Sequence, residues 1–132
     1  MTTTRAVGST VSPALILSAV ISSPLIRAKQ TAEIALENFA KEAKFAIEDA
    51  LRSEAEVTDT MAMLVKYKNY ERIMIVGHDP HMSQFASSLL GSPTPVVEMK
   101  KSALAKFEIV RIDPIRMRGI LVALLPPKVG GL

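Results

Sequence analysis

The segment Ser22-Ser23-Pro24-Leu25-Ile26-Arg27-Ala28-Lys29-Gln30-Thr31-Ala32 decides the fold class of this chain, because two different periodicities meet in it. The residues leading into it, 15–22, form a short apolar run, which predicts a buried strand or, over its first half, a helix. From Arg27 onward, apolar residues recur every three or four positions, which is typical of a helix with one buried face. That face consists of Ala28, Ala32, Ala35, Leu36, Phe39, Ala40 and Ala43. A strand that passes through a short turn into a helix is the unit of an α/β fold.

The same strand–turn–helix pattern returns later in the chain. Residues 72–77 are a continuous apolar run bounded by charge and glycine, which suits a strand buried on both faces of a parallel sheet. Asp79 stands where a helix cap belongs and Pro80 where the first helical residue belongs. Gly91 is expected to end that helix. Its buried face is expected to consist of Met82, Phe85, Ala86, Leu89 and Leu90.

The remaining elements complete the predicted architecture. A short helix capped by Thr58 or Asp59 is expected to run through Met61, Leu64 and Val65. After a proline-rich loop, residues 103–110 and 118–125 are predicted strands separated by a turn at Asp113-Pro114. The order of elements predicts a three-layer α/β sandwich whose sheet is mostly parallel with an antiparallel end strand. Residues 1–14 are predicted to be a flexible lead-in, and residues 15–132 a single domain.

Composition narrows the functional class. Apolar residues make up 48% of the chain, enough for a packed core, and there is no cysteine, so disulfides and thiolate chemistry are excluded. These features favour a cytoplasmic protein, and no apolar run is long enough to cross a membrane. The Thr- and Ser-rich start resembles a leader segment, but it has no convincing cleavage site and is interpreted as a non-standard domain start.

The C-terminal third of the chain is basic. Its charged residues are Lys100, Lys101, Lys106, Arg111, Arg116, Arg118 and Lys128, against Glu108 and Asp113. A solvated face explains this better than a nucleic-acid partner, because no aromatic platform or known nucleic-acid motif accompanies the charge. We therefore expect no nucleic-acid partner. We also expect neither a cofactor nor a bound metal.

Two cationic residues stand at the predicted strand ends, where ligands gather in open α/β sheets. Arg27 offers a planar fork of donors at a helix start, and a protonated His78 would add a second positive group, so the pair suits a phosphoryl group. His78 is the candidate catalytic residue. Ser102, which follows two lysines, could touch the same phosphate from a neighbouring loop.

His81 and the two serines of the first motif are expected to have other roles. His81 follows His78 by about one helical turn and is expected near the mouth of the pocket, exposed to solvent and available for a substrate contact. A metal site shared by the two histidines is disfavoured, because Asp79 would have to leave its capping position. Ser22 and Ser23 flank the pocket, but with no base nearby they are expected to serve turn hydrogen bonding rather than nucleophilic attack.

The two motifs together closely resemble the histidine phosphatase superfamily, in particular its SixA-like phosphohistidine phosphatase branch. That branch carries a Ser-Ser-Pro-x-x-Arg-Ala-x-x-Thr-Ala segment, matched by residues 22–32, and a Val-Gly-His-x-Pro segment, matched by residues 76–80. The later helix, the lysine-rich segment and the terminal Leu-Pro-Pro extend the likeness over about residues 19–127. The resemblance implies that Arg27 and His78 bind and polarise a phosphoryl group on a phosphorylated protein or a small phosphate ester.

One part of the family pattern is missing. In the family the nucleophile is a different histidine, in an Arg-His-Gly motif at the end of the first strand, and this sequence has no Arg-His-Gly. We therefore expect a phosphatase whose route through phosphohistidine is impaired or, alternatively, a non-catalytic phosphate-binding relic or gene fragment. The missing segment is also expected to leave a sheet edge unpaired, which would make the chain marginally stable or cause it to self-associate.

Overall fold

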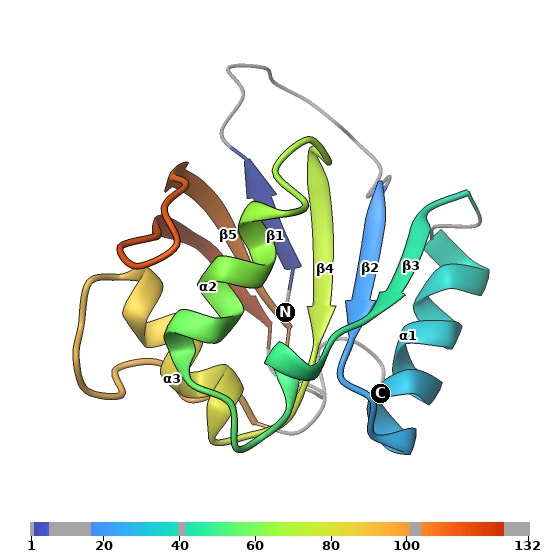
Figure 1. Cartoon of the computed structure of the whole chain (residues 1–132), viewed down its shortest axis with the longest axis horizontal. Coiled ribbons are helices and arrows are strands. Elements are labelled where there is room, and N and C mark those ends of the chain that lie inside the picture. Colours follow the sequence, from blue (N-terminus) through green and yellow to red (C-terminus); the bar gives the residue numbers. More distant parts are fainter. Residues whose placement is uncertain (1, 6–16, 40–41, 101–103, 126–132) are drawn as a thin grey trace.

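The computed structural model describes residues 2–5, 17–39, 42–100 and 104–125. They form a six-stranded sheet in the order β3-β2-β4-β1-β5-β6, with helices on both faces (Figure 1). The strands are β1 Thr2–Arg5, β2 Ala19–Ser22, β3 Lys44–Ile47, β4 Arg72–Val76, β5 Leu104–Arg111 and β6 Arg118–Leu125, and the helices are α1 Ile26–Phe39, η1 Asp49–Leu51, α2 Val57–Val65 and α3 His81–Leu89. The predicted three-layer α/β sandwich is confirmed.

The antiparallel end strand that the sequence predicted is present in the sheet. Strand β2 pairs in parallel with both β3 and β4, and the end strand β6 is antiparallel to β5. Parallel neighbours need a long crossover, and the helices provide it: α1 connects β2 to β3, and α2 lies between β3 and β4. Consequently the carboxyl ends of β2, β3 and β4 lie at one edge of the sheet.

Alternation along the strands builds two cores. On β2, Val20 packs with Ala28 and Ala32 of α1, and the small alanines let that helix lie close to the sheet. Ile21 and Ile75 face the opposite side, where α2 and α3 cover a larger apolar cluster. In Figure 1 the two groups of helices lie on either side of the sheet, with α1 beside β2 and β3.

Strand β1 is a finding that the sequence did not predict. Thr2–Arg5 lies between β4 and β5, antiparallel to the first and parallel to the second (Figure 1). The sequence placed these residues in a flexible lead-in, and the structure gives residues 2–5 as a strand; residues 6–14 lie outside the described part of the chain. The interior of the sheet is therefore filled, and the edges of the described sheet lie at β3 and β6. The unpaired interior edge that motivated the expectation of self-association is not present between β4 and β5.

Helix ends agree with the local rules in part. Gly91 has φ +84, in the left-handed region that glycine tolerates, and it ends α3 as predicted. Helix α2 begins two or three residues earlier than expected: Glu56 is its N-cap, and the backbone N–H of Glu56 donates to the Asp59 carboxylate at 2.9 Å. Leu90, predicted to be buried, is exposed.

Within the described residues, none of the helices has the length and apolarity needed to cross a bilayer.

Candidate functional site

The two strand ends that carry the predicted site meet at one edge of the sheet. Ser22 of β2 is level with Val76 of β4, and the Ser23 N–H donates to the Val76 carbonyl at 2.9 Å. Beyond this point β2 continues into the first turn of α1, and β4 continues through Gly77 and His78 toward α3. The backbone hydrogen bonds of adjacent parallel strands thus carry Ser23 and His78 to the same edge.

His78 is held by a hydroxyl from the neighbouring strand end. Its Nε2 lies 3.3 Å from the Ser23 Oγ, and that oxygen also accepts a hydrogen bond from the Leu25 N–H at 3.2 Å. Ser23 is fully buried, so the ring of the half-buried His78 has a rigid partner on one side. Among the residues that the structure describes, the other ring nitrogen, Nδ1, has no hydrogen-bond partner and is available to a ligand.

Gly77 lets β4 and α3 approach each other next to His78. A Cβ atom at this position would lie 3.0 Å from Met82 Cε and 3.2 Å from Met82 Sδ. Met82 is buried in the first turn of α3, so its side chain would have to shift by a few tenths of an ångström to admit a Cβ atom at position 77. Glycine therefore contributes to the site through close packing.

Arg27 lies in the first turn of α1, at the edge where β2 ends, and is exposed. Its backbone carbonyl accepts a hydrogen bond from the Thr31 hydroxyl at 3.1 Å. Within the described part of the chain its guanidinium has no hydrogen-bond or ion-pair partner. An unpaired guanidinium beside the positive end of a helix dipole suits an anionic ligand.

His81 does not lie where the sequence predicted it. The ring is fully buried rather than exposed at a pocket mouth, and its Nε2 lies 2.6 Å from the Thr60 Oγ of α2. The Thr60 hydroxyl donates to the Ala50 carbonyl at 2.8 Å, which leaves it to accept a hydrogen bond from Nε2–H. Burial lowers the pKa of His81 and favours the neutral ring. The prediction failed because α2 and η1 cover this face of α3.

The two serines of the Ser-Ser-Pro segment are both fully buried. The Ser22 hydroxyl donates to the Ser23 carbonyl at 2.7 Å, which matches the expected turn hydrogen bonding. The expectation that no base lies near Ser23 is wrong, since the His78 ring contacts it. Ser102, the remaining predicted phosphate contact, lies outside the described residues.

Asp79 acts on α3 from just outside the helix. Its Oδ1 accepts hydrogen bonds from the Ser83 N–H at 3.1 Å and from the Ser83 hydroxyl at 2.9 Å. The residue directly before α3 is Pro80, so the expected cap has moved by one position while the carboxylate still satisfies a backbone N–H of the first turn. This keeps the negative charge of Asp79 tied to the helix beside His78.

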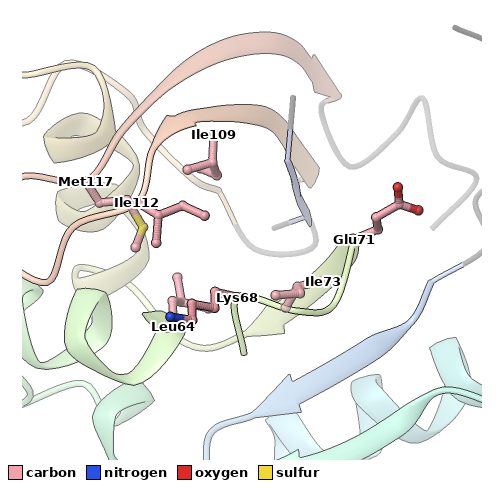
Figure 2. A pocket seen from close by; sticks show the side chains of 7 residues that line it. All are labelled: Leu64, Lys68, Glu71, Ile73, Ile109, Ile112 and Met117. Atoms are coloured by element: carbon pink, nitrogen blue, oxygen red, sulfur yellow. The ribbon is translucent and has the colours of Figure 1, made fainter. Parts of the chain in front are cut away.

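A small hollow lies at the opposite edge of the sheet (Figure 2). It is lined by Leu64, Lys68, Glu71, Ile73, Ile109, Ile112 and Met117, and its volume is about 20 Å³. That volume holds roughly one water molecule. It lies near the amino end of β4, and no predicted site residue lines it, so it is distinct from the candidate site.

Comparison with known proteins supports the overall fold. No family model matches the sequence, and no curated protein matches it significantly. The solved structure of the protein histidine phosphatase SixA complexed with tungstate superimposes with a TM-score of 0.74, over 87% of this chain and 72% of that chain, at 19% sequence identity. This chain has a SixA-like histidine phosphatase fold. The likeness at this identity concerns the fold, and it confirms the fold resemblance inferred from the two sequence motifs.

One difference within the SixA-like fold concerns the first strand. The resemblance implied a nucleophile at the carboxyl end of that strand, inside the sheet. Here β1 is antiparallel to β4. Thr2 is level with Met74, and Arg5 is level with Ile109, toward the other edge of the sheet. The carboxyl end of β1 therefore points away from the edge that carries His78.

Proposed function

We propose that this protein binds the phosphoryl group of a phosphorylated protein or a small phosphate ester between Arg27 and His78. The observation that carries the proposal is that both residues lie at the shared edge of β2 and β4, in a fold similar to that of SixA. The related structure is a complex with tungstate, a tetrahedral oxyanion like phosphate. The absence of cysteine is compatible with work in the cytoplasm.

Each residue has a distinct role in this proposal. The Arg27 fork donates two parallel hydrogen bonds to phosphoryl oxygens, which is the strongest kind of contact available to a phosphate at an exposed site. His78 donates from Nδ1 when protonated, while Ser23 holds Nε2 and fixes the plane of the ring.

Turnover by the double displacement of the histidine phosphatases is impaired in this proposal. The sequence contains two histidines, and one of them, His81, is enclosed in the core. His78 contacts the phosphoryl group in this scheme and does not attack it. Loss of a covalent nucleophile removes several orders of magnitude in rate.

A second candidate is a domain that binds phosphoryl groups without hydrolysing them. The burial of Ser23 favours it: the hydroxyl next to His78 is fully enclosed and already accepts a hydrogen bond from the Leu25 N–H. Attack on a phosphorus atom needs an exposed oxygen that can align with the leaving group. Ser23 therefore serves better as the partner that orients His78.

Binding and turnover can be measured separately. We expect calorimetric titration with tungstate and with inorganic phosphate to show binding that Arg27→Ala and His78→Ala each weaken by about tenfold or more. Arg116→Ala is the matched control, since Arg116 is exposed in the β5–β6 connection at the other edge. Equal affinities in all four proteins would overturn the proposed binding site.

The turnover assay uses a phosphohistidine peptide. We expect phosphate release at or near the uncatalysed rate. Robust release that depends on both Arg27 and His78 would show that the chain has a nucleophile and that catalysis is intact. Binding without release supports the non-catalytic candidate.

A further inference from the structure

Two serines of α3 attach the segment that leads into β5. The Ser87 Oγ accepts hydrogen bonds from the N–H groups of Val96 and Val97, at 2.8 and 2.9 Å. One turn earlier in the helix, the Ser83 Oγ accepts one from the Met99 N–H at 2.7 Å. Both serines are buried, and the segment therefore runs antiparallel to α3, toward the helix start next to His78.

Side chains alternate along this segment. Val97 and Met99 are buried in the core under α3, and Glu98 and Lys100 are exposed. Lys100 thus follows a backbone position that is both hydrogen-bonded and anchored by a buried side chain. The ammonium group projects from a fixed point, which reduces the conformational entropy lost when it binds a ligand.

The sheet register brings the same segment to the edge that carries the candidate site. Thr2 is level with Met74 of β4 and with Lys106 of β5, so Leu104, two residues earlier, is level with Val76 at the end of β4. The connection from Met99 to Leu104 therefore begins at the first turn of α3 and ends at the carboxyl edge of β4.

The Ser83 hydroxyl joins this segment to the site directly. While it accepts from Met99, it donates to the carboxylate of Asp79, with both carboxylate oxygens 2.9 Å away. Asp79 follows His78 in the chain, so one hydroxyl connects the residue before Lys100 with the residue after His78. The Asp79 charge is partly satisfied by Ser83, which leaves Lys100 more available to an external anion.

We propose that Lys100 is a third anion-binding residue of this site, contacting the bound phosphoryl group from the β5 side while Arg27 contacts it from the α1 side. The inference rests on the proposed function. The four-carbon stem of lysine gives the ammonium group reach across the strand edge, and as a flexible point charge it complements the planar fork of Arg27. Ser83 is a positioning residue in this arrangement, because it acts through the backbone of Met99.

The test is titration of the full chain with inorganic phosphate and with tungstate. We expect Lys100→Ala to weaken binding by about fivefold and Lys100→Arg to stay within about twofold of the wild type. Lys44→Ala is the matched control: Lys44 is an exposed lysine at the start of β3, at the amino edge of the sheet. If Lys100→Ala and Lys44→Ala have the same affinity, the inference is wrong.

A second variant tests the positioning role. In a Ser83→Ala background, which releases Met99, we expect Lys100→Ala to weaken binding by less than about twofold. An undiminished fivefold effect in that background would refute the role of Ser83. Different results would overturn the proposed function and the role of Lys100. The proposed function fails if Arg27→Ala and His78→Ala leave affinity unchanged, and the Lys100 inference fails if they weaken binding while Lys100→Ala does not.

Discussion

Replacing Thr60 by valine tests the buried polar contact that joins three elements of the α2–α3 layer. The Thr60 hydroxyl of α2 donates to the Ala50 carbonyl of η1 at 2.8 Å and lies 2.6 Å from His81 Nε2 of α3. Thr60 and His81 are both fully buried. Valine has nearly the same shape, so the substitution removes the hydrogen bonds without opening a cavity.

The expected loss of stability follows from the polar groups that Thr60→Val leaves without hydrogen-bond partners. In the Thr60→Val protein, the His81 N–H loses its partner inside the core, and the partly buried Ala50 carbonyl loses its partner as well. An unsatisfied buried group costs about 1–3 kcal/mol, and the partly buried Ala50 carbonyl costs less because water reaches it, so we expect a loss of about 2–4 kcal/mol in the free energy of unfolding. A domain of this size is stable by about 5–15 kcal/mol, so the loss is a large fraction of the total.

Urea unfolding monitored by far-UV circular dichroism measures this loss, at about pH 8 so that histidine is neutral. The matched control is Thr58→Val, the same substitution on the same helix at an exposed position, which we expect to change stability by less than about 0.5 kcal/mol. If Thr60→Val is no more destabilising than Thr58→Val, the buried contact does not stabilise the fold as described here.

Two pH-dependent predictions follow from the same layer of the structure. Burial lowers the pKa of His81 below its usual 6.5, so in acid the unfolded chain binds more protons than the folded chain. The contribution of His81 to stability is therefore fully present above about pH 6.5 and falls as the pH drops below that value. In urea titrations at a series of pH values, His81→Gln is expected to flatten this dependence. Burial first, and then the 2.6 Å hydrogen bond to Glu48, raise the pKa of Tyr67 to about 12, so stability is lost as the pH rises from about 10 toward that value. In an ultraviolet titration of tyrosine, Tyr67→Phe should remove the late transition and Glu48→Gln should shift it to lower pH; a late transition that persists in Tyr67→Phe would contradict the assignment.

The strand–turn–helix units were predictable because their signals are local. The alanine stripe after Arg27 and the apolar run before Gly77 identify α1 and β4 from residues that are neighbours in sequence. The shared edge of β2 and β4 then follows from the general geometry of parallel sheets. For this reason the common location of Arg27 and His78 could be anticipated, although the Ser23 contact that holds the ring could not.

The features that the sequence did not predict share a different cause. His81 was expected to be exposed because its position was judged from α3 alone, and its burial depends on Thr60 of α2, which lies far away in the sequence. Strand β1 carries no apolar pattern of its own, and it is a strand only because β4 and β5 supply hydrogen-bonding partners on both sides. Neither fact can be read from a single stretch of chain.

The amino-acid sequence by itself determined which segments become strands and helices and which cations stand where strands end, since side-chain periodicity and turn chemistry act over a few residues. The tertiary structure decided which side chains are enclosed and which remain open to a ligand: it buried His81, directed β1 against β4, and brought Lys100 toward the edge that carries His78. Those outcomes depend on hydrogen bonds and packing between distant segments, and such contacts exist only after the chain has folded.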